Sequence, residues 1–213
     1  MFMSDSALEL ALFFYSYKMV CKMTEETPQV HKKSGFFKEL VKFTLIAFLI
    51  VVPFRIFIAQ PFIVNGASME PTFHPGEYLI VDQLTYKAFS QPKRGEVIIF
   101  RYPQDTTKFF IKRVVGLPGE TIEIRGENIR ISNSDFPEGF LLDEDYLSFR
   151  KQDNLKTKLK SDEYFVMGDN RPQSSDSRIW GPLKEELIIG RPLVRLFPVN
   201  RLQFLPGSFS FQR

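Results

Sequence analysis

One long apolar stretch, residues 43–64, constrains the fold more than any other part of the chain. It reads FTLIAFLIVVPFRIFIAQPFIV and carries a single charge, Arg55. A helix that crosses a bilayer needs about 20 predominantly apolar residues. The apolar residues follow no one-sided helical period, which argues against a core helix of a soluble protein. We therefore predict one membrane-spanning helix over residues 43–64, with Pro53 and Arg55 weakening only its far end.

Basic residues set the predicted orientation of this helix. After Arg55 no basic residue occurs until Lys87, whereas four lysines lie shortly before or at the start of the stretch. They are Lys32, Lys33, Lys38 and Lys42. Because flanking basic residues favour the cytoplasmic side, we expect residues 1–42 in the cytoplasm. Residues 65–213 then form a domain on the outer (periplasmic) side of the cytoplasmic (inner) membrane, held by a single-pass anchor.

A cleavable signal peptide is the main alternative for the same stretch, because it too has a basic start and an apolar middle. No A-x-A pattern follows the apolar run, and the run is longer than the apolar region of a typical signal peptide. A second apolar patch, LELALFFYSY within residues 1–22, is too short to span a bilayer. Both Met1 and Met23 are candidates for the start of the protein.

Composition excludes several classes of function. A chain of 213 residues with 44% hydrophobic content can bury one sizeable core. The net charge of +3 is too small to predict nucleic-acid binding. One cysteine, Cys21, and two scattered histidines, His31 and His74, cannot supply a structural zinc site. The sequence also has no glycine-rich phosphate loop, so we predict neither a metal nor a cofactor.

Beyond the apolar stretch the pattern predicts an all-β domain. Short β-rich runs alternate with Gly and Pro: EYLIV, EVIIFRY, FFIKRVV, ETIEI, NIRIS, EYFVM and PLVRLF. ETIEI and NIRIS flank RGE, which is typical of a β-hairpin. Residues 133–162 are polar with weak periodicity, and we interpret them as a small excursion from the main sheet.

Two residues far apart in sequence suggest a serine hydrolase that uses no histidine. Ser68 lies in GASMEPT, and Lys112 lies among apolar residues in FFIKRVVGLPGE. A serine hydroxyl needs a base to become a nucleophile, and a lysine serves as that base only when burial favours its neutral amine. His31 precedes the apolar stretch and His74 lies in the Pro/Gly-rich turn FHPGE. A Ser-His-Asp triad therefore lacks a good member.

A third segment, GDNRPQSSDSR over residues 168–178, is a polar loop that we expect to close onto the same site. Each segment alone is compatible with a structural role: SMEPT with an exposed turn, KRVVG with a strand, and GDN with a turn held by an Asx hydrogen bond. Together, in this order and after an anchor, SMEPT, KRVVGLPGE and GDNRPQSSDSR resemble the three diagnostic motifs of the bacterial type I signal (leader) peptidases. The resemblance extends from Phe62 to Pro198.

The resemblance implies a serine-lysine mechanism. In this chain it makes Ser68 the residue that attacks the scissile carbonyl and Lys112 the general base. Ser174 corresponds to a serine that hydrogen-bonds to the lysine and orients it. The implied fold is a mostly antiparallel β-domain of coiled sheets that needs no metal and no cofactor.

The resemblance also assigns supporting and substrate-binding residues. Asp176 and Arg178 would brace the site as an ion pair, and Arg113 and Asp169 belong to the same motifs. Phe62 and Val64 fall where the family lines shallow apolar pockets for small side chains at the minus-one and minus-three substrate positions, which implies cleavage after Ala-x-Ala. The implied partners are signal peptides of secreted preproteins, the lipid bilayer and the nearby protein-export machinery, with no nucleic acid.

One position, Gly66, departs from part of this family. Some members carry a serine two residues before the nucleophile, and its hydroxyl donates to the oxyanion. Here the Ser68 backbone N–H is the remaining candidate donor, and the second donor is open. If no side chain supplies that donor, we expect Gly66→Ser to keep or raise activity and Gly66→Val to damage it by crowding the substrate backbone. An equally large loss in both would mean that glycine is needed for backbone conformation or close approach.

Three other functions are compatible with parts of the sequence. A serine-lysine peptidase with a narrower duty, such as pilin or organellar processing, would carry the same motifs. Self-cleaving repressor proteases share the dyad but carry a DNA-binding domain where this chain has its apolar stretch. A membrane-anchored β-domain that binds exported peptides without cutting them would be expected to lose the nucleophile or the base, and this chain keeps Ser68, Lys112 and Ser174.

Overall fold

The computed structural model describes residues 33–53, 59–83, 86, 91–209 and 211. The chain forms two compact units, Met1–Leu49 and Ile50–Arg213. The candidate start sites, Cys21 and His31 lie outside the described residues, as does Arg55.

A single long helix, α2, covers Lys33–Pro53. It begins ten residues before the predicted span 43–64 and ends at Pro53. Ala59–Ile63, which the prediction placed in the helix, instead form strand β1, so the predicted far end of the helix is wrong. Proline supplies no amide hydrogen for a strand ladder, and Pro61 is accommodated because β1 lies at the edge of its sheet. Within the described part of the chain, no helix is both long and apolar enough to cross a membrane.

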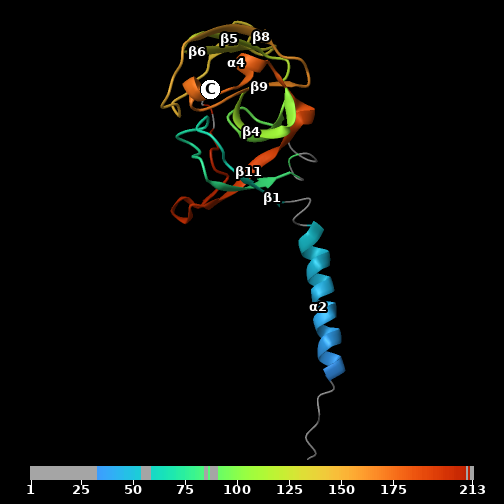
Figure 1. Ribbon diagram of the computed structural model, residues 1–213. Coiled ribbons are helices and arrows are strands. Elements are labelled where there is room, and N and C mark those ends of the chain that lie inside the picture. The colour runs from blue at the N-terminus through green and yellow to red at the C-terminus, as the bar shows by residue number, and fades with distance from the viewer. Residues whose placement is uncertain (1–32, 54–58, 84–85, 87–90, 210, 212–213) are drawn as a thin grey trace, which may run out of the picture. The chain divides into compact units, whose positions relative to one another are not determined.

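The second unit is built from two antiparallel sheets, as the strand pattern predicts (Figure 1). The larger sheet has the order β1-β2-β11-β3-β4-β9-β10, with β12 paired to β11. Its strands are β1 (Ala59–Ile63), β2 (Tyr78–Asp82), β3 (Val97–Tyr102), β4 (Asp105–Gly116), β9 (Glu163–Met167), β10 (Leu183–Lys184), β11 (Ile188–Phe197) and β12 (Gln203–Phe204). Short helical turns in the same unit are η2 (Arg171–Gln173), α4 (Ser177–Trp180), η3 (Glu185–Leu187) and η4 (Val199–Arg201).

The smaller sheet has the order β7-β6-β5-β8. Its strands are β5 (Thr121–Gly126), β6 (Asn128–Ser132), β7 (Phe140–Leu141) and β8 (Asp153–Lys158). The predicted hairpin forms between β5 and β6, where Arg125 pairs with Asn128 and Gly126 has a φ of +64°. That positive φ suits glycine because it has no Cβ. Residues 133–162 lie off the larger sheet, and they supply β7 and β8 of the smaller one.

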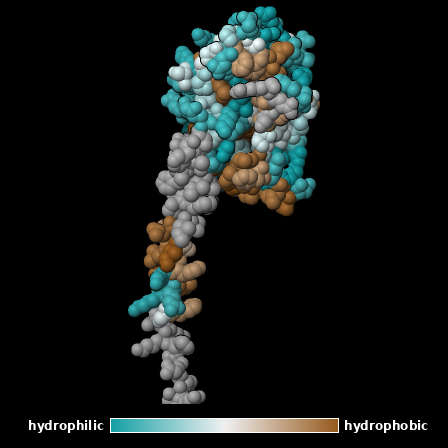
Figure 2. All heavy atoms as spheres, turned by 180° about the vertical axis from the view of Figure 1, so that it is seen from behind, coloured by the Kyte–Doolittle hydropathy of each residue, from teal (hydrophilic) through white to brown (hydrophobic). Residues whose placement is uncertain are grey.

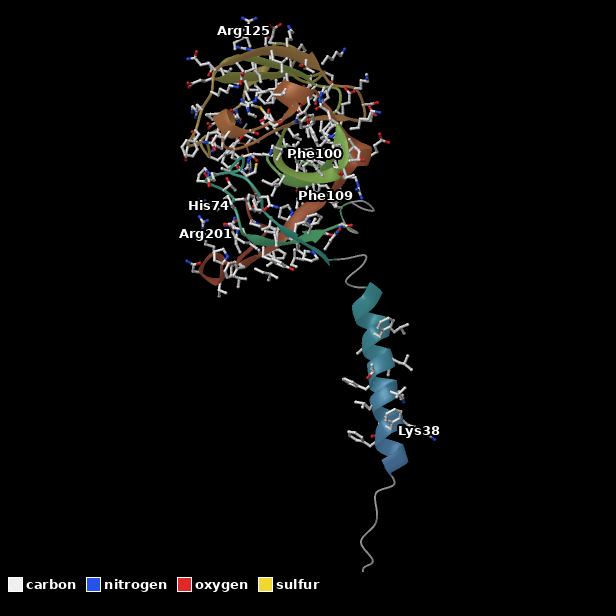
Figure 3. The ribbon with its side chains drawn as sticks, in the orientation of Figure 1. Lys38, His74, Phe100, Phe109, Arg125 and Arg201 are labelled. Carbon is white, nitrogen blue, oxygen red and sulfur yellow. The ribbon has the colours of Figure 1, made fainter. Side chains whose placement is uncertain are left out.

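Alternating side chains give the smaller sheet one apolar face, whereas strands β3 and β9 of the larger sheet bury side chains on both faces. In the smaller sheet Ile122 and Ile124 of β5 are buried, while Arg125 points outward (Figure 3). In the larger sheet Phe100 is buried among apolar residues of β4, β9 and β10. A further cluster lies around the turn after β1 and consists of Val64, Met69, Phe73, Leu79 and Val97. This cluster fixes the turn that carries Ser68.

The larger sheet leaves an apolar surface exposed around β11, β12 and η4. Figure 2 shows apolar side chains gathered at this end of the strand unit. The exposed residues there include Leu196, Phe197, Val199, Leu202 and Phe204. We call these five residues the apolar rim. Such a concentration of large exposed apolar side chains is uncommon unless it contacts another surface.

Candidate functional site

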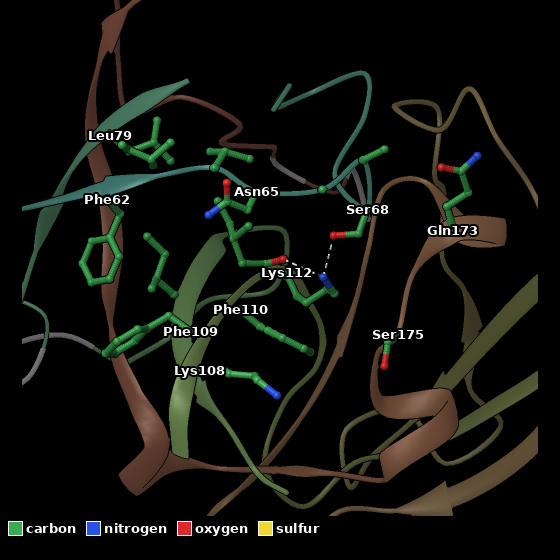
Figure 4. Close-up of a pocket in the computed structure, with 16 residues that line it drawn as sticks. Phe62, Asn65, Ser68, Leu79, Lys108, Phe109, Phe110, Lys112, Gln173 and Ser175 are labelled. Atoms are coloured by element: carbon green, nitrogen blue, oxygen red, sulfur yellow. Dashed lines mark hydrogen bonds between the residues drawn. The ribbon is translucent and has the colours of Figure 1, made fainter. Parts of the chain in front are cut away.

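A cleft runs between the chain after β1 and the first half of β4, as Figure 4 shows. Its walls are mostly apolar. The lining residues are Phe62, Ile63, Val64, Asn65, Gly66, Ala67, Ser68, Leu79, Ile99, Lys108, Phe109, Phe110, Ile111, Lys112, Gln173 and Ser175. The sequence prediction identified only a few of these, and Leu79 and Ile99 reach the cleft only through the pairing of distant strands.

The structure brings Ser68 and Lys112 together at one side of this cleft. Lys112 lies on β4 opposite Ile98 of β3, and Ser68 lies in the turn after β1. The Lys112 Nζ and Ser68 Oγ atoms are 2.7 Å apart, within hydrogen-bonding distance. Nζ also donates to the Ile111 carbonyl at 2.9 Å, which fixes the end of this flexible side chain.

Burial lowers the pKa of Lys112 from its ordinary value of 10.5 to about 8. Desolvation is the largest cause, since a charged ammonium loses hydration inside the protein. The carboxylates of Asp176 and Asp169 act in the opposite direction, and Arg178 lowers the pKa further. The Phe110 ring centroid lies 5.3 Å from Nζ and helps to exclude water. The result is an amine that is neutral in a useful fraction of molecules near neutral pH.

The polar loop, residues 168–178, packs directly behind Ser68. The Asn170 amide donates to the Ser68 carbonyl at 3.0 Å. A side chain at Gly168 would collide with the Ser68 carbonyl and with Ser174 Oγ, so the close approach requires glycine there. Ser174 is buried beside this contact, but it forms no hydrogen bond with Lys112 in the described structure. The hydrogen bond that the resemblance implies between Ser174 and Lys112 is therefore not made here.

Two buried ion pairs support the loop. Arg113 pairs with Asp169 through two hydrogen bonds of 2.8 and 2.6 Å. Arg178 pairs with Asp176 through two hydrogen bonds of 2.8 Å each. Burial alone would raise the pKa of Asp176, but hydrogen bonds and the positive charge of Arg178 outweigh it and hold the pKa below its ordinary value. Asp176 also accepts from the Gly168 amide at 3.1 Å, so both ends of the loop are tied together.

The two residues expected to bind substrate, Phe62 and Val64, both line the cleft. Phe62 lies edge-on to Phe109 across the cleft, with ring centroids 5.3 Å apart. Leu79 and Ile99 add to the apolar wall and were not predicted. They belong to β2 and β3, and only the strand order places these strands beneath the cleft.

Gly66 has a φ of +83°, and its missing side chain would meet no atom within 4 Å. Space therefore permits a side chain at this position, but the backbone conformation disfavours one. The expectation that Gly66→Ser keeps or raises activity rested on the absence of a side-chain donor here, with a backbone requirement for glycine as the alternative outcome. The left-handed backbone is the physical reason to revise it.

His74 lies apart from this chemistry. Its Nδ1 atom lies 3.5 Å from a Glu70 carboxylate oxygen, its side chain is 38% exposed, and it does not line the cleft. Within the described residues, no group of three or more His, Cys, Asp or Glu side chains is arranged to hold a metal ion.

Known proteins similar to this chain share one description. A family model described as "Signal peptidase, peptidase S26" matches residues 37–197. The probable signal peptidase I-1 of Synechocystis is 36% identical, covering 83% of this chain and 90% of its own length. Signal peptidase I T of Bacillus subtilis is 34% identical, covering 84% of this chain and 94% of its own length. A crystal structure of a signal peptidase I from Enterococcus faecalis is 29% identical and has a TM-score of 0.41, covering 49% of this chain and 98% of that one.

Proposed function

Since the chain belongs to the signal peptidase family, peptidase S26, we propose that it removes signal peptides from exported preproteins as a serine endopeptidase. Ser68 is the proposed nucleophile and neutral Lys112 the proposed general base. The observation that carries this proposal is the 2.7 Å separation between Ser68 Oγ and the buried Lys112 Nζ. No other described base lies as close to that hydroxyl.

In the proposed reaction the neutral amine of Lys112 accepts the Ser68 hydroxyl proton as Oγ attacks the scissile carbonyl. The resulting ammonium then gives its proton to the leaving amine, which departs as the new N-terminus of the mature protein. A water molecule, deprotonated by Lys112, hydrolyses the acyl-enzyme and restores Ser68. The Ser68 backbone N–H is the first proposed oxyanion donor, and a main-chain group supplies the second.

The cleft supports a preference for small side chains at the minus-one and minus-three positions. Phe62 and Val64 wall it on one side and Phe109 faces Phe62 across it, which leaves shallow apolar space. A small apolar side chain such as alanine fills such a space without displacing the rings. We therefore assign cleavage after Ala-x-Ala to this site.

We further propose that the enzyme works at the cytoplasmic membrane, with residues 65–213 on the outer side and close to the export machinery. The lysines before residue 43 and the apolar residues that follow them support this orientation. The apolar rim supports contact of the strand unit with lipid, because it exposes five large apolar side chains.

The test is a cleavage assay with the full chain in detergent. Incubated with a preprotein that carries an Ala-x-Ala site, the wild-type protein should release a mature product whose new N-terminus follows the second alanine. Ser68→Ala should lower kcat/KM by about a thousandfold or more, and His74→Ala should retain wild-type activity. Binding of the preprotein without any shortened product would instead indicate a peptide-binding protein.

A further inference from the structure

A buried acidic residue outside the three motifs, Glu144, reaches the loop that carries Ser174. It lies on the chain between β7 and β8, residues 142–152, which we call the β7–β8 connection. Both Glu144 and Arg171 are buried. The Arg171 Nη1 atom donates to Glu144 Oε2 at 3.0 Å, and Nη2 donates to Glu144 Oε1. The smaller sheet thereby contributes an ion pair to the candidate site.

Arg171 also contacts the main chain behind Ser68. Its Nε atom donates to the Gly168 carbonyl at 3.1 Å. The neighbouring Asn170 amide donates to the Ser68 carbonyl at 3.0 Å. Phe149 of the β7–β8 connection also forms an isolated parallel bridge with Asn170. The main chain of residues 168–170 is thus held between this connection and Ser68.

A second contact from the same connection reaches the other ion pair of the site. The Tyr146 hydroxyl donates to Glu144 at 2.9 Å. The Tyr146 ring lies against the Arg113 guanidinium, and the Arg113 Cζ atom is 4.4 Å from the ring centroid. Arg113 follows Lys112 in sequence and pairs with Asp169. Tyr146 therefore contacts both Arg113 and Arg171, whereas Glu144 contacts Arg171.

The Glu144–Arg171 pair is better suited to fixing geometry than to adding stability. Burying two charges costs hydration that their mutual attraction only partly returns, so an apolar pair of similar volume would often be as stable. An apolar pair, however, would not supply the directional hydrogen bond to Gly168. We infer that Glu144 is a positioning residue: through Arg171 it holds residues 168–170 against Ser68, so that the Ser68 backbone N–H stays aimed at the oxyanion. Its effect on rate rests on the proposed function, whereas its effect on the loop does not.

Amide hydrogen exchange of the full chain tests the loop directly. In Glu144→Gln the Asn170 amide should exchange at least tenfold faster than in the wild type, while the Val114 amide in the sheet core keeps its protection. Glu120→Gln is the matched control, because Glu120 is also buried and pairs with an arginine, Arg94, at 2.6 Å. Wild-type protection of Asn170 in Glu144→Gln would overturn the inference, as would an equal loss in Glu120→Gln.

Kinetics with a preprotein then test the consequence. Glu144→Gln should lower kcat by about tenfold to a hundredfold with KM unchanged, since a small displacement of a catalytic group costs about that much. The pH midpoint at which the cleavage rate rises, as Lys112 loses its proton, should not move, because Lys112 keeps its surroundings. A shift of that midpoint, or a rise in KM with kcat unchanged, would contradict a positioning role.

A double variant keeps the proposal testable if Glu144→Gln fails to fold. Glu144→Leu/Arg171→Met removes both charges together and leaves neither unpaired. It should fold, lose Asn170 protection and show the same fall in kcat. A folded double variant with wild-type kcat and wild-type Asn170 protection would overturn the inference. If the wild-type chain itself cleaves no preprotein, the proposed function fails, and the exchange measurement still decides whether Glu144 holds the loop.

Discussion

The pKa of Lys112 determines how the rate of preprotein cleavage should depend on pH. Only the neutral amine accepts the Ser68 proton, and burial places the pKa at about 8 instead of 10.5. At pH 7 a pKa of 8 leaves about 9% of the amine neutral, whereas a pKa of 10.5 would leave about 0.03%. Burial therefore increases the active fraction about 300-fold at neutral pH.

The assay is the initial rate of cleavage at a preprotein concentration well below KM, measured from about pH 6 to pH 10 with the full chain in detergent. Under this condition the rate reports kcat/KM and therefore the pKa of the free enzyme. Below about pH 7 the rate should rise about tenfold per pH unit, because a single deprotonation limits it. Between pH 7 and pH 9 the total rise should be about tenfold, and the rate should then reach a plateau. Circular dichroism at each pH checks that the fold is unchanged.

Lys112→Arg is the matched variant for this measurement. Arginine keeps the positive charge and a similar length, but it does not lose its proton in the accessible range. The variant should therefore be inactive at every pH. A wild-type cleavage rate whose rise is centred near pH 10.5 would refute the burial argument. A pH-dependent cleavage rate in Lys112→Arg would refute the assignment of Lys112 as the base.

Three other experiments, with four substitutions, test residues near the proposed dyad. Gly168→Ala should abolish cleavage and lower the unfolding midpoint, measured by calorimetry, because its methyl group would collide with Ser174 and the Ser68 carbonyl. In urea titrations, the free energy of unfolding of the wild type relative to Lys112→Met should rise by about 2 kcal/mol from pH 7.5 to pH 10. The sign follows because between pH 8 and 10.5 the unfolded lysine holds a proton that the folded one has lost. Gly66→Ser and Gly66→Ala should lose stability equally, by about 1–2 kcal/mol, and should cleave at the same reduced rate.

Local patterns in the sequence were sufficient to predict the β-rich class and the β5–β6 hairpin. Alternating isoleucines and the RGE turn encode that hairpin within a dozen neighbouring residues, so no distant contact is needed to form it. The far end of α2 was not predictable in the same way. Residues 59–63 are as apolar as the helix before them, and only their pairing with β2 makes them a strand.

The candidate site likewise contains residues that were predictable from local sequence and residues that were not. Ser68 and Lys112 were identified from motifs, and the strand pairing brings them together. Glu144 was not identified, because residues 133–162 show no pattern beyond polarity and the partner, Arg171, is distant in sequence. A buried ion pair between two loops leaves no periodic signal. Only the folded arrangement distinguishes this glutamate from the exposed acidic residues around it.

The backbone at Gly66 bears on the expectation that Gly66→Ser keeps activity. The comparison with the family leaves two alternatives at position 66, a missing side-chain donor or a backbone that requires glycine. With a φ of +83° the backbone favours glycine at this position, because any L side chain is strained there even though the surrounding space is open. A serine at this position either keeps the positive φ at a cost of about 1–2 kcal/mol or moves the backbone toward negative φ, which would shift the chain that leads to Ser68. We therefore propose an oxyanion hole of main-chain N–H groups, whose aim depends on how firmly the turn carrying Ser68 is held.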